Sequence, residues 1–390
     1  MSNSGPGRHF LQIPGPTNLP ERVKRALSRP TIDHRGPDWA RLTLRILEQL
    51  KQVFQTSGPV IVYPSSGSGA WEAAMVNTLS AGDRVLFGSN GQFSSNWQKV
   101  AAGVGLTVEE LQGDWRCPID MAALENRLAE DRGREIRALA LVHNETSTGV
   151  VNDVAGARAA LDRTQHDALL MVDVVSSLGA MAYKHEEWGV DVTIAGSQKG
   201  LMTPPGLGFN APSPKALAAS SSAGLPRSYW NWEPVMAFNR DGFYPYTPAT
   251  NLLYGLDVAL SMLLEEGLPQ VFARHARLAE ATRRAVRGWG LDVFCRDAKA
   301  YSSALTAVAM PAGYNPDVLR QVILERFDMS LGTGLGQVKG KVFRIGHLGD
   351  MNDLMLAGTL CGVEMGLAAC DVPHVSGGVN EALAFLAKDP

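Results

Sequence analysis

The fold of this chain can be worked out from the hexapeptide Ala195-Gly196-Ser197-Gln198-Lys199-Gly200. It follows a largely apolar run, residues 190–195, and precedes Pro204-Pro205-Gly206, which ends regular structure. A lysine at the end of a buried strand loses its proton more easily than a surface lysine, because desolvation disfavours the ammonium form. Lys199 is therefore a candidate for forming an imine with a cofactor. A lysine in a solvated turn is the alternative.

The composition narrows the class of protein. The chain has 390 residues, of which 45% are hydrophobic, and this is enough for a large core. A net charge of -3 without a long basic run argues against a nucleic-acid or anionic-membrane surface. Four scattered cysteines without C-x-x-C spacing predict neither a disulfide framework nor a metal site. No apolar run reaches transmembrane length, so we expect a soluble cytoplasmic protein with no membrane partner.

The hydrophobic pattern predicts an α/β fold. Several strands are continuous apolar runs, such as residues 138–142 and 169–172, and these are typical of a mainly parallel sheet covered on both faces. The expected strands are 60–63, 84–87, 106–110, 136–143, 169–174 and 192–195. The expected helices between them are 71–79, 96–103, 121–130 and 154–162.

Three segments are expected along the chain. Three prolines and a glycine between Pro14 and Pro20 exclude regular structure, so residues 1–20 are predicted to form an N-terminal arm. An amphipathic helix through Leu252 and Leu263 ends at Gly267, where we place a domain boundary. Residues 21–267 then form a large domain, and residues 268–390 form a smaller α+β C-terminal domain.

The stretch 65–72 follows a strand and opens a helix with the sequence Ser-Ser-Gly-Ser-Gly-Ala-Trp-Glu. Backbone N–H groups and the helix dipole at such a turn bind anions, most often a phosphate. Glu72 stands where the dinucleotide motif G-x-G-x-x-G has its third glycine, which disfavours NAD binding. A plain glycine-rich turn is the other alternative.

Asp173 ends the apolar run Leu169-Leu-Met-Val172. A buried carboxylate needs a cation or hydrogen-bond donors, and a protonated pyridine nitrogen would provide one. A simple cap of the following turn is the alternative. The stretch from His143 to Gly149 also follows a strand and offers hydroxyl and amide groups, although such clusters are usually loops. Arg344, within an apolar strand, suits a bidentate carboxylate contact or a structural salt bridge.

These features occur in an order that resembles fold-type I pyridoxal-phosphate enzymes. From Phe10 to about Gly349 the chain resembles class V aminotransferases, in particular the serine/alanine/aspartate-glyoxylate branch. The matching motifs are Pro14-Gly-Pro-Thr-Asn18, Asp33-His-Arg35, Ser66-Gly-Ser-Gly69, Asn144-Glu-Thr-Ser-Thr-Gly149, Val172-Asp-Val-Val-Ser-Ser177, Gly196-Ser-Gln-Lys-Gly200, Tyr246-Thr-Pro248 and Phe343-Arg-Ile-Gly-His347.

The resemblance implies a role for each matching residue. Lys199 is the Schiff-base lysine, Asp173 the partner of the ring nitrogen, and Arg344 the group that binds the substrate carboxylate. Ser147 would approach the phenolic oxygen of pyridoxal phosphate. The remaining cofactor contacts would be Ser66, Gly67, Ser68 and Gln198 at the phosphate, Phe93 and Val175 on the ring, and Tyr244 and Thr247 from a neighbouring subunit, with His34 and Arg35 as the interface pair that contacts the amino donor.

The implied activity is transamination from a small amino acid to glyoxylate by a homodimer with shared sites. Serine is the expected donor, with aspartate and alanine as alternatives. Serine and alanine need little beyond Arg344, whereas aspartate would need a second cation for its side-chain carboxylate, and Arg35 is available for that. A lyase or cysteine desulfurase and a cofactor-binding regulator without turnover are more distant alternatives. Two residues depart from the family pattern. Val174 stands where many relatives have Gly or Ala, and Ser68 where some have His or Thr. Neither change removes a group that the reaction needs, so they bear on the choice of substrate and not on the reaction.

Overall fold

The computed structural model describes residues 7–388. Its larger sheet has seven strands in the order β2-β10-β9-β8-β5-β3-β4. β8, β9, β5, β3 and β4 are parallel, whereas β10 is antiparallel to both of its neighbours. The strands are β2 (Ile61–Ser65), β3 (Arg84–Ser89), β4 (Thr107–Gln112), β5 (Ile136–Val142), β8 (Leu169–Asp173), β9 (Val192–Gly196) and β10 (Gly206–Pro212).

This sheet confirms the predicted α/β class with a mainly parallel sheet. Its helices are α2 (Pro37–Phe54), α3 (Gly67–Thr78), α4 (Gln92–Gly103), α5 (Met121–Glu130), α6 (Val154–Arg163) and α7 (Pro214–Ser220). Leu42, Ile46 and Leu50 on α2 are buried, as their helical spacing predicts. The two-stranded ribbon β6 (Asn144–Glu145) and β7 (Val150–Val151) projects from the end of β5.

Strand β10 was not predicted. Pro204, Pro205 and Gly206 indicated an irregular region, but the two prolines form only the turn that reverses the chain after Lys199, and Gly206 is already the first residue of the strand. The strand itself pairs with both β2 and β9 and is buried almost throughout. Its apolar residues Leu207, Phe209 and Ala211 do alternate along the chain, but Gly, Asn and Pro, which are depleted in strands, stand between them and obscured the pattern.

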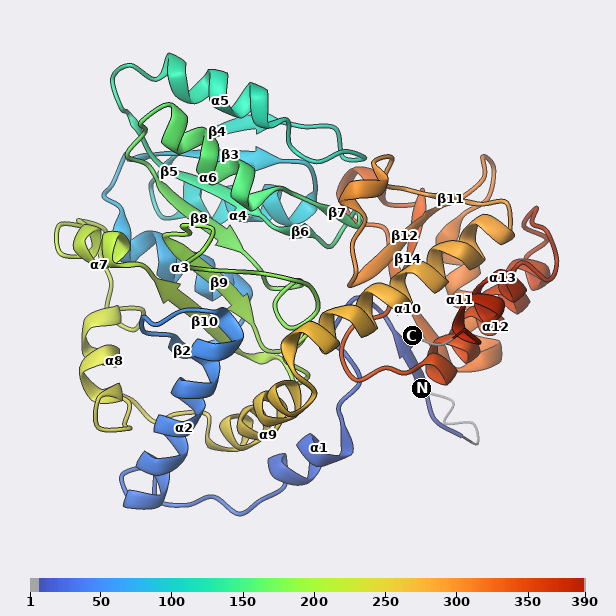
Figure 1. The fold of residues 1–390 in the computed structure, drawn as a ribbon, viewed down its shortest axis with the longest axis horizontal. Coiled ribbons are helices and arrows are strands. Elements are labelled where there is room, and N and C mark those ends of the chain that lie inside the picture. Colours follow the sequence, from blue (N-terminus) through green and yellow to red (C-terminus); the bar gives the residue numbers. More distant parts are fainter. Residues whose placement is uncertain (1–6, 389–390) are drawn as a thin grey trace.

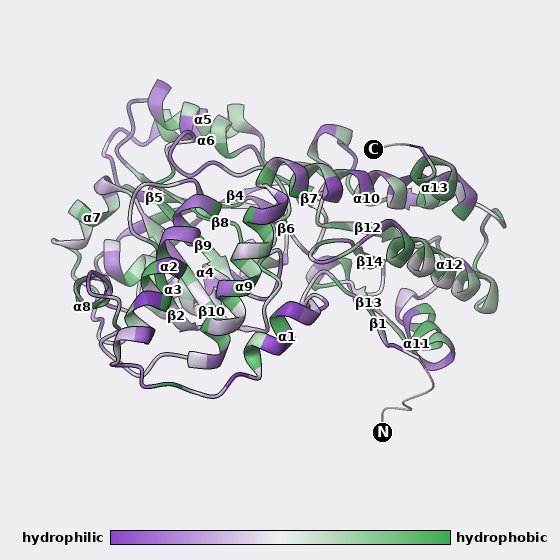
Figure 2. Cartoon of the chain, turned by 60° about the horizontal axis from the view of Figure 1, so that its bottom comes forward, coloured by the Kyte–Doolittle hydropathy of each residue, from purple (hydrophilic) through white to green (hydrophobic). Residues whose placement is uncertain are grey.

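The smaller sheet has the order β1-β13-β14-β12-β11 and lies at the other end of the molecule (Figure 1). Its C-terminal strands are β11 (Asp292–Val293), β12 (Leu305–Ala309), β13 (Met329–Thr333) and β14 (Val342–Gly346). The helices α11 (Pro316–Phe327), α12 (Asp353–Ala369) and α13 (Val379–Leu386) gather around it (Figure 2). This mixture of helices and antiparallel strands agrees with a smaller α+β unit.

The N-terminal arm contains a β-strand in addition to its extended segment. Its strand β1 (Phe10–Gln12) joins the smaller sheet and pairs in parallel with β13, so that Phe10 lies opposite Met329. The arm then turns through Pro14 and Gly15 toward the larger sheet, and the Thr17 amide donates to the Gln198 carbonyl at 3.1 Å. The arm therefore connects the two sheets. Residues 1–6, which the predicted arm includes, lie outside the described residues.

The remaining helices connect the two parts of the molecule. They are α1 (Glu21–Leu27), α8 (Trp232–Asn239), α9 (Thr250–Glu266) and the long α10 (Leu268–Gly288), which runs from the larger sheet to the smaller one (Figure 1). Gly267 separates α9 from α10, and the domain boundary placed there stays a prediction. Among residues 7–388, none of the helices has the length and apolar character needed to cross a membrane.

Candidate active site

A cavity lies where β5, β8 and β9 reach their carboxyl ends, the edge at which open α/β sheets bind ligands. The residues around it come from these strands, the loops after them, the first turns of α3 and the start of α4. They are Ser66, Gly67, Ser68, Trp71, Phe93, Val142, Asn144, Thr146, Asp173, Val175, Gln198 and Lys199. Eight of the residues predicted from the sequence are thus brought together: Ser66, Gly67, Ser68, Phe93, Asp173, Val175, Gln198 and Lys199.

Lys199 lies in the turn after β9 and is only 8% exposed. Its Nζ donates a hydrogen bond to the Pro14 carbonyl of the N-terminal arm at 2.5 Å. Burial, together with the positive charge of Arg344, lowers the pKa of Lys199 to about 8, while the nearby Asp173 acts in the opposite direction. The solvated-turn alternative is therefore wrong, and an appreciable share of Lys199 is free amine near neutral pH.

Gly15 allows the arm to approach Lys199 this closely. A Cβ atom at Gly15 would lie 2.2 Å from Lys199 Cδ, and the residue has a φ of +96°, which side-chain-bearing residues rarely adopt. The glycine of the Pro-Gly-Pro sequence is thus explained by contact with the lysine, a reason that the sequence alone did not provide.

Asp173 ends β8 and is buried, with a hydrogen-bond donor on each carboxylate oxygen. The Val175 amide donates to Oδ1 and the Trp71 indole Nε1 donates to Oδ2, both at 2.7 Å. Burial raises the pKa of Asp173 to about 7, while the two hydrogen bonds act in the opposite direction. A bound cation beside Asp173 would keep the carboxylate ionised.

Helix α3 begins at Gly67, directly at the cavity. Within residues 7–388 no side chain caps this N-terminus, so its first N–H groups remain available to an anion. A Cβ atom at Gly67 would lie 2.7 Å from Val175 Cγ2, so glycine is needed where these two residues meet. The Gln198 Oε1 atom, also at the cavity, is buried and has no hydrogen-bond partner in the described part of the chain.

Glu145 organises one wall of the cavity, a role that was not predicted. Its buried carboxylate accepts hydrogen bonds from the amides of Phe93 and Ser94 at the start of α4 and from the Ser147 amide. The Ser147 hydroxyl also donates to it, at 2.6 Å. Burial raises the pKa of Glu145 against these hydrogen bonds, and all of the partners are donors to a carboxylate. Phe93 is thereby held at the edge of the cavity.

Ser147, expected near the phenolic oxygen, is not among the residues around the cavity. Its hydroxyl oxygen accepts a hydrogen bond from the Gln92 amide, and its O–H donates one to Glu145. The hydroxyl is therefore bound to the residues that support the cavity wall and does not face the cavity. Asn144 and Thr146 of the same motif line the cavity instead. Asn144 and Glu145 lie on the short strand β6, where neighbouring side chains point to opposite faces, whereas Thr146 and Ser147 lie in the turn that follows. Asn144 Oδ1 has no partner among the described residues.

Arg344 lies on β14 of the smaller sheet and is 7% exposed. It donates from Nε to the Thr333 carbonyl at 2.8 Å and from Nη1 to the Thr146 carbonyl at 2.7 Å. No carboxylate among residues 7–388 lies within salt-bridge distance of it, which disfavours the structural salt bridge. Burial lowers the pKa of Arg344 to about 10, so it remains a cation.

Six predicted residues are not among those around the cavity: Ser147 and Arg344, described above, and four more. His34 and the exposed Arg35 lie in the loop between α1 and α2. Tyr244 is buried beside Tyr246, and its hydroxyl has no partner in the described part of the chain, whereas Thr247 is exposed. Trp71, Val142, Asn144 and Thr146 are cavity residues that sequence reasoning did not assign. Of these, Trp71 was detectable, because it lies one helical turn after Gly67.

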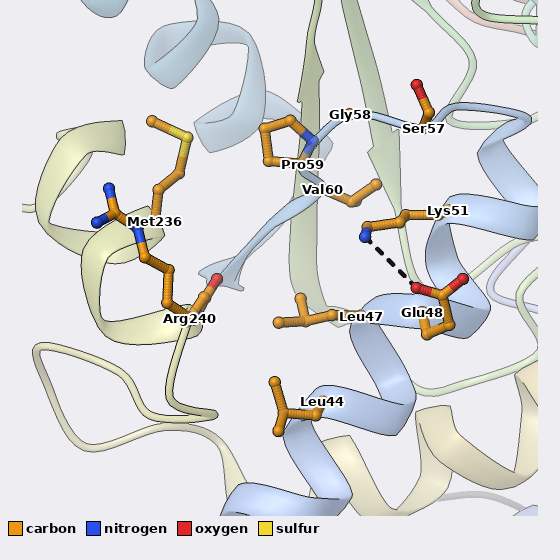
Figure 3. A pocket seen from close by; sticks show the side chains of 11 residues that line it. Leu44, Leu47, Glu48, Lys51, Ser57, Gly58, Pro59, Val60, Met236 and Arg240 are labelled. Carbon is orange, nitrogen blue, oxygen red and sulfur yellow. Dashed lines mark hydrogen bonds and ion pairs between the residues drawn. The ribbon is translucent and has the colours of Figure 1, made fainter.

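A second hollow lies between α2 and α8 (Figure 3). Leu44 and Leu47 of α2 face Met236 of α8 across it, and its one ion pair joins Lys51 to Glu48 at 3.4 Å. It shares no residue with the Lys199 cavity, and it contains no unpaired acid or nucleophile suited to catalysis. We therefore assign the candidate site to the Lys199 cavity.

The cavity fits pyridoxal phosphate. The uncapped N-terminus of α3 would hold the phosphate, and Asp173 would accept from the protonated ring nitrogen. Two buried amide oxygens, Gln198 Oε1 and Asn144 Oδ1, lack partners that a bound polar group would supply. Together with the buried Lys199, these groups define a fold-type I pyridoxal-phosphate enzyme.

Comparison with known proteins identifies the family. A model of the aminotransferase class-V family matches residues 21–334, and the chain belongs to that family. The chain is 44% identical over 385 residues to a serine–glyoxylate aminotransferase of Arabidopsis thaliana, covering 98% of this chain and 96% of the relative. An L-aspartate–glyoxylate aminotransferase of Paracoccus denitrificans is 44% identical over 363 residues, covering 93% and 91%.

The solved structures agree with the family. The pyridoxamine–pyruvate aminotransferase of Mesorhizobium loti superposes with a TM-score of 0.91 at 27% identity and covers 99% of both chains. The protein is thus a pyridoxal-phosphate-dependent aminotransferase of class V.

Proposed function

We propose that this enzyme transfers the amino group of serine to glyoxylate, forming glycine and the 2-keto acid of serine. The observation that carries the proposal is the environment of Arg344. Among the described residues its buried guanidinium donates only to carbonyl oxygens, so it can bind the single carboxylate of serine and then that of glyoxylate. The name of the Arabidopsis relative supports the same donor and acceptor.

Each residue of the site has a defined task in this reaction. When bound, pyridoxal phosphate carries the amino group between the two substrates and withdraws the negative charge that develops at the substrate Cα. Lys199 removes the proton from that Cα and returns a proton later, for which a pKa of about 8 suits it. Asp173 keeps a proton on the ring nitrogen, and Arg344 orients the carboxylate. Because donor and acceptor use the same site in turn, ping-pong kinetics are expected.

Aspartate is the second candidate donor, supported by the Paracoccus relative. Its second carboxylate needs a second cation, and Arg35 is the predicted one. In the present structure Arg35 is exposed and does not line the Lys199 cavity of its own chain. Alanine needs no second cation, so it too remains a donor to be tested. Serine is favoured over aspartate because it needs only Arg344 for its charge, and over alanine because of the name of the Arabidopsis relative.

The desulfurase alternative lacks its nucleophile. That chemistry requires a reactive thiol beside the cofactor. None of the four cysteines lines the cavity, and burial raises the pKa of Cys295 to about 11. All four cysteines are free, which suits the reducing cytoplasmic compartment that we propose for the enzyme.

A donor panel tests the proposed reaction. Purified enzyme loaded with pyridoxal phosphate is supplied with glyoxylate and with serine, aspartate or alanine, and glycine formation is measured. We expect the highest kcat/KM with serine. A higher kcat/KM with aspartate would replace serine by the second candidate, and the absence of glycine with all three donors would refute the proposal.

We also propose a homodimer in which Tyr244 and Thr247 complete the site of the other subunit. In support, neither residue lines the Lys199 cavity of its own chain, although both match cofactor-binding positions of the family. Thr247 is exposed and accessible to a second subunit. His34 and Arg35, in an exposed loop, would likewise act across the interface.

Mixing two inactive variants tests the shared site. Lys199→Ala and Thr247→Ala subunits are refolded together, so that a hybrid dimer has one site with both substitutions and one with neither. Random pairing then restores about a quarter of wild-type activity per dimer. If Thr247 acts within its own chain, the mixture shows only the sum of the two variants.

A further inference from the structure

Trp71 connects the two ends of the cavity. It lies four residues after Gly67, so it projects from the same face of α3 as the start of the helix, where the phosphate is expected. Its indole N–H donates to Asp173 Oδ2 at 2.7 Å. One helix thus supplies the anion-binding N-terminus and also a donor to the carboxylate at the other end of the cavity.

The orientation of this indole is fixed by its neighbours. Trp71 is 4% exposed and stacks on Trp97, with ring centroids 5.8 Å apart and an angle of 11° between the planes. Trp97 in turn meets the edge of Phe87 from β3, at 5.7 Å and 82°. The indole therefore cannot rotate away from Asp173 without disturbing the packing of α3, α4 and β3.

The two donors to Asp173 act on different oxygens. The Val175 amide belongs to the turn directly after the aspartate, and it holds Oδ1. Among residues 7–388, Trp71 is the one donor to Oδ2, and it comes from another element. It therefore fixes the rotation of the carboxylate about the Cβ–Cγ bond. A charge-assisted hydrogen bond of this kind also stabilises the carboxylate relative to the protonated acid.

We propose that Trp71 is a positioning residue, which holds Asp173 ionised and turned toward the cofactor ring and ties it to the phosphate-binding turn of α3. The inference rests on the proposed role of Asp173 as the partner of the ring nitrogen. Trp71 would thus act through its hydrogen bond to Asp173 as well as through its packing against Trp97.

The stacked pair provides a matched control. Trp97 is fully buried against Trp71, but its own indole N–H has no hydrogen-bond partner among the described residues. Trp71→Phe and Trp97→Phe therefore make the same chemical change in the same aromatic stack, and only the first removes a hydrogen bond. Trp71→His keeps a ring with an N–H donor and serves as the conservative variant.

The test measures the affinity of each apoenzyme for pyridoxal phosphate and the pH midpoint of the visible absorbance of the bound cofactor. We expect Trp71→Phe to weaken cofactor binding about ten- to a hundredfold, the worth of a hydrogen bond to a charged group. Its absorbance midpoint should shift in the same direction as in Asp173→Asn, but by less. Trp97→Phe removes no hydrogen bond, so it should weaken cofactor binding much less than Trp71→Phe does, and Trp71→His should recover part of the loss.

Equal effects of Trp71→Phe and Trp97→Phe on both measurements would overturn the proposal, because they would reduce Trp71 to a packing residue. An unchanged absorbance midpoint in Trp71→Phe beside a shifted one in Asp173→Asn would overturn it as well. If Asp173→Asn itself changes neither affinity nor midpoint, the assignment of Asp173 fails, and the proposal for Trp71 fails with it.

Discussion

Removal of the Arg344 guanidinium is the most direct test of how the site binds carboxylates. A guanidinium has five N–H donors, and two of those of Arg344 form hydrogen bonds with the carbonyls of Thr333 and Thr146. The remaining donors can form a bidentate contact with a substrate carboxylate. Arg344→Ala therefore removes the contact without leaving a protein carboxylate unpaired.

The size of the effect follows from this geometry. Two charge-assisted hydrogen bonds contribute about 1.5 to 3 kcal/mol each, and truncation of one partner in a buried charge pair costs about 2 to 5 kcal/mol. At about 1.4 kcal/mol for each tenfold change, kcat/KM should fall about 30- to 4,000-fold. The loss should affect the amino donor and glyoxylate alike, because both substrates present a carboxylate to the same guanidinium.

The assay is single-turnover kinetics of each half-reaction, followed through the absorbance of the bound cofactor. Arg320→Ala is the control, since Arg320 lies in the same part of the molecule but is already paired with Asp317 at 2.8 Å. A change of less than about threefold is expected there. The reasoning is refuted if Arg344→Ala resembles Arg320→Ala, or if only one of the two substrates is affected.

Three further predictions concern the lysine and the cavity wall. Borohydride reduction should fix the cofactor to Lys199, so Lys199→Ala should abolish labelling; a labelled peptide elsewhere in the chain would exclude this lysine. Glu145→Gln should lower the free energy of unfolding by about 2 to 4 kcal/mol in urea titrations, because amide hydrogens replace an acceptor beside buried N–H donors; a loss below about 0.5 kcal/mol would show that the wall does not depend on the charge. In the apoenzyme, burial lowers the pKa of Lys199 from 10.5 to about 8, so between these values the unfolded chain holds a proton that the folded one has lost, and the stability of the wild type rises with pH through this window. Lys199→Met should accordingly be more stable than wild type at pH 7, by up to about 3 kcal/mol, and should lose this advantage near pH 10.5; a difference independent of pH would contradict the low pKa.

The positions of the main groups could be predicted because they follow strands. Asp173 and Lys199 come directly after apolar runs, and parallel neighbouring strands place their carboxyl ends at one edge of a sheet. The hydrophobic pattern of the sequence did not predict contacts between elements that are distant in the sequence. The carbonyl of Pro14 at Lys199 and the indole of Trp71 at Asp173 depend on how the arm and α3 pack, and no local periodicity encodes either.

Ser147 shows the same limit on a smaller scale. Its motif follows β5 as expected, but Ser147 lies in the turn between β6 and β7, where its hydroxyl donates to Glu145. A hydroxyl is equally suited to a cofactor or to a buried carboxylate, so residue type alone did not decide between them. The role predicted for Ser147 stays a prediction, while Asn144 and Thr146 are the members of the motif that line the cavity.

The N-terminal arm has a consequence for the order in which the enzyme can be assembled. Strand β1 is synthesised long before its partner β13, which begins only at Met329. The Pro14 carbonyl is held at Lys199 by a chain that is anchored in that late sheet. A ribosome-bound chain that has completed the larger sheet therefore still lacks the anchored arm. The lysine acquires its final surroundings only when β1 and β13 have paired.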